Sequence, residues 1–97
     1  MIRHTVVFNL NGSNGSPAER LFMDAAIKLS SMLGVYRFEC LRQTGKKNNF
    51  TYGLSMEFDT LEDYEAYNIH PDHLGFVQTI WIKYVQDFLE VDYEPFK

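Results

Sequence analysis

Residues 50–58 alternate between apolar and small or polar side chains, and this alternation constrains the fold more than any other feature of the chain. Phe, Tyr, Leu, Met and Phe occupy the even positions, whereas Thr, Gly, Ser and Glu occupy the odd ones. Successive side chains of a β-strand point to opposite faces of its sheet, so a period of two predicts a strand with one apolar face. We expect helices to bury that face, which leaves the face with small or polar side chains available for another contact.

Three further stretches are predicted to be extended. Residues 2–10 are rich in β-branched side chains and roughly alternate between polar and apolar ones. Residues 35–42 precede residues 50–58, and the Gly and Asn residues between them suit a hairpin loop, so these two strands should pair antiparallel. Residues 88–93 are the last extended stretch.

A first helix is predicted to follow the turn-forming residues 11–16. Ser16, Pro17 and Glu19 form a capping signal that satisfies or removes the free amides of a helix start. Apolar residues then recur at spacings of three and four as far as Gly34, which can supply the left-handed residue that ends a helix. This apolar face comprises Ala18, Leu21, Phe22, Ala25, Leu29, Met32 and Leu33.

A second helical region is predicted to be broken in two. Thr60 caps its first part, which stops at His70 because a residue before proline disfavours helical angles. Pro71 and Asp72 open the second part, whose apolar residues at helical spacing are Leu74, Val77, Trp81, Tyr84 and Val85. The order is therefore βαββαβ, which predicts an α+β, ferredoxin-like fold: a four-stranded antiparallel sheet with its helices on one face.

Size and composition predict one domain over residues 1–97, with a partner for its bare sheet face. The chain has 97 residues, and 15% of them are aromatic, which is more aromatic surface than a minimal core of this length needs. We expect some of it to line an interface or a pocket. Because a bare sheet face would expose several hundred Å² of apolar surface, a homodimer is the simplest cover for it.

The net charge and the cysteine content indicate which partners and which cellular compartment to expect. The net charge of −4 lacks the basic footprint of nucleic-acid binding, and no apolar stretch suits a signal peptide or a membrane span. Cys40 is the only cysteine, which excludes an internal disulfide, fits a reducing compartment and favours the cytoplasm. We expect Cys40 to be a small packed residue of its strand rather than a nucleophile.

Several segments carry a resemblance to a known family. The first extended stretch begins Ile-Arg-His-Thr-Val-Val-Phe, a His70-Pro71-x-His73 segment lies between the last helical pieces, and Val-Asp-Tyr at residues 91–93 ends the last extended stretch. Together with the βαββαβ order, these segments resemble the stress-responsive A/B barrel, or Dabb, family over essentially the whole chain. The resemblance implies a ferredoxin-like subunit whose sheet pairs with that of a second subunit into a dimeric α/β barrel.

His73 is the first candidate for chemistry. It is expected in the first turn of the final helix, where the positive end of the helix dipole favours a neutral imidazole that can accept a proton. The negative charge of Asp72 next to it favours the protonated ring instead. The histidine could also have no chemical role and cap the helix or fill a polar corner. Tyr67 could reach the same cavity across the Pro71 break, or be a buried core aromatic.

The resemblance implies roles for some of these residues. In polyketide cyclases that resemble this chain, a histidine at the position of His73 acts as base and a tyrosine at that of Tyr67 steers ring closure of a thioester. His4 matches a first-strand histidine of the same pocket. A third-strand histidine of that pocket is replaced here by Tyr52.

Two hypotheses about function therefore remain. The first is a dimer of unassigned reaction, whose pocket holds a small apolar or aromatic ligand. The second is a cofactor-independent cyclase-like or monooxygenase-like enzyme, with His73 as general base and Tyr67 orienting the substrate. The first is favoured because a resemblance establishes fold better than function. The candidate lining residues are His4, Phe22, Tyr52, Leu54, Tyr67, His73 and Trp81.

Metal and cofactor sites are not expected. His70 and His73 are three residues apart, but the Pro71 junction separates their helical phases and no third ligand follows at a typical spacing. The sequence also has no Gly-rich phosphate loop and no nucleophile-elbow motif.

Overall fold

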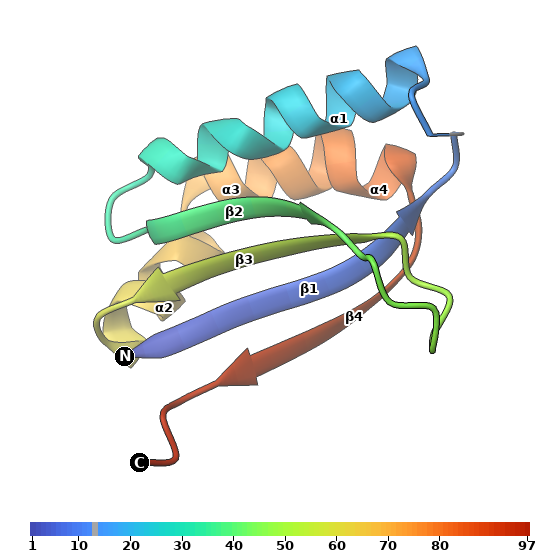
Figure 1. The fold of residues 1–97 in the computed structure, drawn as a ribbon. Helices are drawn as coiled ribbons and strands as arrows, with labels where there is room; N and C mark the ends of the chain where they lie inside the picture. The colour runs from blue at the N-terminus through green and yellow to red at the C-terminus, as the bar shows by residue number, and fades with distance from the viewer. Residues whose placement is uncertain (13) are drawn as a thin grey trace.

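In a computed structural model that describes residues 1–12 and 14–97, the chain has the predicted order of strands and helices (Figure 1). The expected turn over residues 11–16 includes Ser13, which lies outside the described residues. The elements are β1 (Ile2–Leu10), α1 (Pro17–Ile27), the 3-10 turn η1 (Lys28–Ser31), β2 (Tyr36–Arg42), β3 (Tyr52–Phe58), α2 (Leu61–Ile69), α3 (Pro71–Phe76), the π-helical turn η2 (Val77–Trp81), α4 (Ile82–Tyr84) and β4 (Val85–Tyr93).

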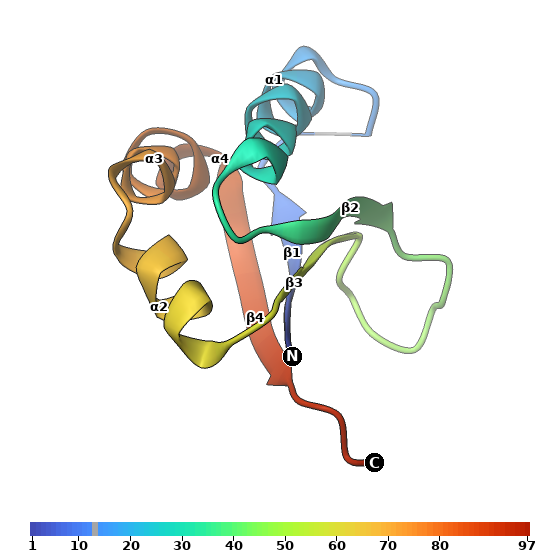
Figure 2. The same ribbon diagram turned by 90° about the vertical axis from the view of Figure 1, so that its left-hand side faces the viewer.

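The four strands form one antiparallel sheet in the order β2-β3-β1-β4. Figure 2 shows the helices gathered on one side of this sheet. In the central part of the sheet, Val6 of β1 lies opposite Leu54 of β3 and opposite Glu90 of β4. Since directly opposed residues of an antiparallel pair share a face, these three side chains belong to the face that the helices cover.

The alternation of residues 50–58 is confirmed by β3. Tyr52, Leu54, Met56 and Phe58 are each at most 4% exposed and face the helices. Their neighbours in the core are Val6, Phe8 and Leu10 of β1, Phe22 and Ala26 of α1, and Val35 and Tyr67. Full burial of one large apolar side chain contributes about 1.5–3 kcal/mol, so this layer between sheet and helices holds the domain together.

The capping signal before α1 forms as predicted. The Ser16 hydroxyl oxygen accepts a hydrogen bond from the Glu19 backbone N–H at 3.1 Å, and Pro17 occupies the first helical position. The Glu19 carboxylate reaches back to the Gly15 N–H at 2.9 Å rather than to Ser16 itself. Both ends of the motif therefore bind backbone donors, which fixes where the helix begins.

The first helix is shorter than predicted. Regular α-helix ends at Ile27, the 3-10 turn η1 follows, and Leu33 is 96% exposed instead of lying on the apolar face. The hydroxyls of Ser30 and Ser31 donate to the carbonyls three residues earlier, a local bond that competes with helical hydrogen bonding. Gly34 does adopt the predicted left-handed conformation, with φ of 87°.

The second helical region breaks at His70, as predicted, and is less regular than predicted beyond that point. His70 is extended, with ψ of 138°, and α3 begins at Pro71. The π-helical turn η2 follows α3, and only three residues of α4 remain before the chain turns into β4. Val85, which was predicted to be helical, is the first residue of that strand.

Among residues 1–12 and 14–97, no helix covers the second face of the sheet (Figure 2). Glu57 lies there and accepts hydrogen bonds from Arg3 at 2.8 Å and Arg37 at 3.0 Å, which holds the pKa of its carboxyl below the usual range. Four large apolar side chains of this face are 43–55% exposed: Tyr36, Leu41, Leu89 and Tyr93.

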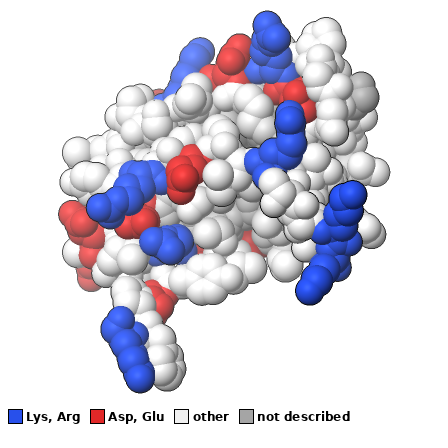
Figure 3. All heavy atoms as spheres, viewed as in Figure 1, with Lys and Arg blue, Asp and Glu red and all other residues white. Residues whose placement is uncertain are grey.

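On the surface of the molecule, acidic and basic side chains are interspersed in the view of Figure 3. No helix in the described part of the chain is long and apolar enough to span a bilayer.

Candidate functional site

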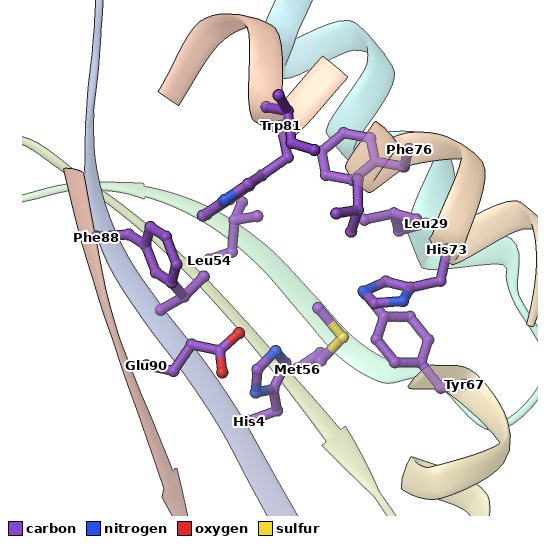
Figure 4. Close-up of a pocket in the computed structure, with 13 residues that line it drawn as sticks. His4, Leu29, Leu54, Met56, Tyr67, His73, Phe76, Trp81, Phe88 and Glu90 are labelled. Carbon is purple, nitrogen blue, oxygen red and sulfur yellow. The ribbon is translucent and has the colours of Figure 1, made fainter. Parts of the chain in front are cut away.

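A cavity of about 320 Å³ lies between the sheet and the helical segment from α3 to α4 (Figure 4). Ile82 is 70% exposed and Phe88 is 52% exposed, and both line the cavity, so its mouth lies between α4 and β4. This volume is in the range of sites for small organic ligands. The lining residues are His4, Val6, Leu29, Leu54, Met56, Tyr67, His73, Phe76, Val77, Trp81, Ile82, Phe88 and Glu90.

The helical wall of the cavity owes its shape to the π-helical turn η2. The Ile82 N–H donates to the Val77 carbonyl, an i to i+5 bond that accommodates one residue more than an α-helical turn. Val77, Trp81 and Ile82 therefore all lie on the cavity wall. Trp81 is fixed from behind by the core, because its ring lies 5.2 Å from that of Phe8 and 6.0 Å from that of Phe22.

The polar groups of the cavity gather at one end, as Figure 4 shows for His73, Tyr67 and His4. The rings of Tyr67 and His73 are tilted against each other with centroids 4.4 Å apart, and those of Tyr67 and His4 are 6.5 Å apart. These side chains come from α2, α3 and β1, which are far apart in the sequence. The cavity thus has an apolar part and a polar end, where His4, Tyr67 and His73 can donate or accept hydrogen bonds and where the Glu90 carboxylate lies beside His4.

The position of His73 follows from the break in the helical region. The His70 ring accepts a hydrogen bond from the Asp72 backbone N–H at 3.0 Å and so caps α3. His73 sits one turn later, where its Nδ1 lies 3.0 Å from the Asn68 carbonyl oxygen. Because a carbonyl only accepts, Nδ1 carries the hydrogen, and in the neutral ring Nε2 is left as the acceptor.

Burial is the main influence on the ionisation of His73. It lowers the pKa of His73, and the hydrogen bond to the Asn68 carbonyl and the negative charge of Glu90 offset only part of that effect. Desolvation disfavours the charged ring because imidazolium loses its hydration inside an apolar cavity. The opposing effect of Asp72 that the sequence suggested has no counterpart here, since the Asp72 carboxylate lies 3.8 Å from His70 instead.

His4 is held from outside the cavity by a carboxylate. Its Nδ1 lies 2.5 Å from a carboxylate oxygen of Asp92 on the neighbouring strand β4. The Tyr64 hydroxyl donates to the other Asp92 oxygen at 2.8 Å and lies 3.0 Å from the same ring nitrogen. A carboxylate accepts the Nδ1 hydrogen, so the ring orientation is fixed and the other edge faces the cavity.

Tyr67 is 3% exposed and contributes a hydroxyl to the polar end. Burial raises the pKa of Tyr67, and the nearby Tyr64 and Glu90 raise it further. The hydroxyl therefore stays protonated and can donate a hydrogen bond. Among the described residues it has no hydrogen-bond partner of its own, so it is available to a bound molecule.

Five of the seven predicted lining residues meet at this cavity: His4, Leu54, Tyr67, His73 and Trp81. Phe22 does not reach it, because α1 packs so closely on the sheet that the Phe22 ring is fully buried against Phe8 and Phe76. Placing Phe22 in the pocket was wrong: it belongs to the core behind Trp81. A helical apolar pattern does not separate a residue that lines a cavity from one that fills the core.

Tyr52 also lies away from the cavity. It sits at the other end of the sheet, where its hydroxyl bonds to Asn14 at 2.8 Å and to the Glu19 carboxylate. Burial and the Glu19 carboxylate raise the pKa of Tyr52 to about 12. Cys40, near Tyr52, is exposed rather than packed because β2 is an edge strand, and burial of part of its side chain raises the pKa of its thiol.

Sequence reasoning missed the other eight lining residues, above all Glu90. The even-numbered positions of β1 and β3 could have indicated Val6 and Met56, since they share a face with His4 and Leu54. Glu90 gives no such signal, because an acidic residue on an edge strand is typical of solvent-exposed sheet. Its register opposite Val6 is what brings it to the cavity.

A metal centre finds no support among the described residues. No three His, Cys, Asp or Glu side chains of residues 1–12 and 14–97 converge as a metal ion would require. His70 caps α3 at the surface while His73 points into the cavity, so the two histidine rings do not face a common site.

The fold and the cavity define a class of protein: a ferredoxin-like α+β domain with a site between its sheet and its helices. Residues 2–95 match the family model described as the stress responsive A/B barrel domain, Dabb, and the chain belongs to that family. The resemblance read from the sequence is thereby confirmed.

Solved structures agree with this assignment. A Dabb family protein with a ferredoxin-like fold from Mesorhizobium loti is 46% identical, with a TM-score of 0.95 over 99% of this chain and 97% of that chain. A dimeric ferredoxin-like protein of unknown function from Thermobifida fusca is 21% identical, with a TM-score of 0.78 over 97% and 90%. A hydroxynitrile lyase from Passiflora edulis is 13% identical, with a TM-score of 0.83 over 95% and 90%. The latter two show the fold alone. No functionally curated protein matches the chain.

Proposed function

We propose that this protein is a homodimer whose subunits each bind a small apolar or aromatic molecule in the cavity between sheet and helices. The observation that carries the proposal is the cavity itself, with its apolar walls and a polar end formed by His4, Tyr67 and His73. Apolar walls give a ligand most of its binding energy, and a few convergent polar groups fix its orientation.

The homodimer is proposed from the uncovered sheet face. Leu41, Leu89 and Tyr93 are about half exposed there, and a second copy of the same face would cover them with a two-fold interface. The protein from Thermobifida fusca with the same fold is described as dimeric. The cavity lies on the other side of the sheet, so dimerisation by this face leaves its mouth accessible.

Ligand binding is testable because Trp81, the only tryptophan of the chain, lines the cavity. We expect a neutral bicyclic probe, 2-naphthol, to change Trp81 fluorescence saturably and to raise the melting temperature. A ligand at a hundred times its dissociation constant stabilises the folded state by about 2.7 kcal/mol.

The control is a pair of variants that add the same ring at two neighbouring positions of the helical segment, one that lines the cavity and one that does not. Val77→Phe fills the cavity and should abolish binding, whereas Gln78→Phe adds its ring at an exposed neighbour that does not line the cavity and should leave binding intact. Equal binding of 2-naphthol by both variants would contradict the proposal, and so would the absence of any response in the wild type.

A second candidate function, proton abstraction from carbon, is favoured by the geometry of His73. Its Nδ1–H donates a hydrogen bond to the Asn68 carbonyl, so the unprotonated Nε2 could take a proton from a carbon flanked by carbonyls. The Tyr67 hydroxyl, kept protonated by its raised pKa, could donate a hydrogen bond to the resulting enolate oxygen. Exchange of substrate C–H hydrogen for deuterium in D₂O tests this function: His73→Ala should abolish it and Tyr67→Phe should slow it.

A further inference from the structure

The charge of the cavity indicates which ligands the proposed site can accept. Among the described lining residues Glu90 is the only acid, and no lysine or arginine is present. In Figure 4 the Glu90 side chain extends from β4 toward the side of the cavity on which His4 lies. Glu90 is solvent-exposed, and among the described lining residues it is the one that brings a formal negative charge to this cavity.

The other titratable groups of the cavity do not neutralise Glu90. The lowered pKa of His73 keeps its ring uncharged at neutral pH, and the raised pKa of Tyr67 keeps its hydroxyl protonated. His4 faces the Asp92 carboxylate at 2.5 Å, so any positive charge on its ring is already matched from outside the cavity. The cavity with its surroundings thus carries a net negative charge at pH 7.

A bound molecule strengthens the electrostatic interactions of the Glu90 carboxylate. When a ligand displaces water from the apolar part, the effective dielectric around Glu90 falls and its interactions strengthen. A carboxylate that loses water without gaining a donor is destabilised, while a second anion beside it adds repulsion. A charged donor on the ligand instead forms a charge-assisted hydrogen bond, about twice as strong as a neutral one.

We propose that the cavity selects amphiphilic amines: molecules with an aromatic or alicyclic body that packs against Trp81 and Leu54, and a protonated amino group that binds Glu90. This inference rests on the proposed function, because it assumes that the cavity binds ligands, and it deepens that function by naming the class. The Glu90 carboxylate disfavours carboxylic acids of the same shape.

The test compares three ligands with one skeleton: 3-phenylpropylamine, 3-phenylpropanol and 3-phenylpropanoate. Dissociation constants come from Trp81 fluorescence at pH 7 and low salt. We expect the amine to bind about tenfold more tightly than the alcohol, which corresponds to about 1.4 kcal/mol, and the propanoate to bind most weakly. Added salt should reduce the advantage of the amine.

The decisive variants are Glu90→Gln and its charge-matched control Glu65→Gln on the exposed surface of α2. Glu90→Gln should lower amine affinity to that of the alcohol and leave the alcohol within about twofold of its wild-type value, whereas Glu65→Gln should change neither. A propanoate that binds as tightly as the amine, or an amine advantage that survives in Glu90→Gln, overturns the inference and leaves the proposed function standing. If 2-naphthol and all three phenylpropyl compounds fail to bind, both are overturned.

Discussion

At the residue scale, His73 is the cavity histidine whose ionisation is altered by burial. Burial lowers its pKa, so in an NMR titration its ring should change charge below the ordinary value of 6.5. A lowered pKa also means that the unfolded chain binds the proton more strongly. The folded state therefore loses stability as the pH falls from 6.5 through the pKa of His73.

Replacement of the ring tests this linkage. In His73→Ala, the free energy of unfolding should fall less below pH 6.5 than in the wild type, because the contribution of this residue is absent. Urea denaturation across the pH range measures the difference. A His73 titration midpoint above 6.5 would mean that the ring is not desolvated, and the argument for a neutral Nε2 at the polar end would fail.

Single residues also show where sequence reasoning about the site stops. Tyr67 and His73 could be predicted together because they flank one helix break, and Leu54 and Trp81 because both follow apolar patterns. Phe22 follows the same kind of pattern and is core, since a pattern gives the buried side of a helix but not where the packing leaves space. Glu90 reaches the cavity through strand register, which alternation within one strand does not encode.

At the scale of elements, the start of α1 depends on one hydroxyl. Ser16→Ala removes the acceptor of the Glu19 N–H and should cost about 1 kcal/mol of folding free energy. For a domain of this size, that lowers the melting temperature by roughly 4–8 °C. Ser30→Ala, whose hydroxyl only returns to the Ile27 carbonyl, should change stability by less than about 0.5 kcal/mol in the same melting experiment. Equal losses in both variants would contradict the capping role.

Helix starts were more predictable than helix interiors and ends. Ser16, Thr60 and the His70-Pro71 pair each leave a local chemical signal, and α1, α2 and α3 begin where these signals place them. The π-helical turn η2 leaves no such signal, although its Trp81 packs onto Phe8 of the core. That turn shapes the cavity wall, so the site is less predictable than the fold that holds it.

At the scale of the whole molecule, the layer structure explains both the fold and its proposed partner. The domain measures 36 × 32 × 18 Å, and its short dimension has room for one sheet and one helical layer. The βαββαβ order and the alternation of residues 50–58 were enough to predict these layers. They also predicted a free sheet face, whereas the partner of that face depends on two chains.

The proposed dimer makes Leu89 a sensitive position. Leu89 lies opposite Val7 in the uncovered face and is 54% exposed, so Leu89→Lys would place two charges within a two-fold apolar interface. We expect the wild type to sediment as a dimer and Leu89→Lys as a monomer with unchanged circular dichroism. Leu21→Lys on α1, a leucine of similar exposure at 47%, introduces the same charge on the helical side and should remain a dimer. A dimeric Leu89→Lys would show that subunits associate through another surface, and a monomeric wild type would show that the exposed apolar side chains of the sheet face water.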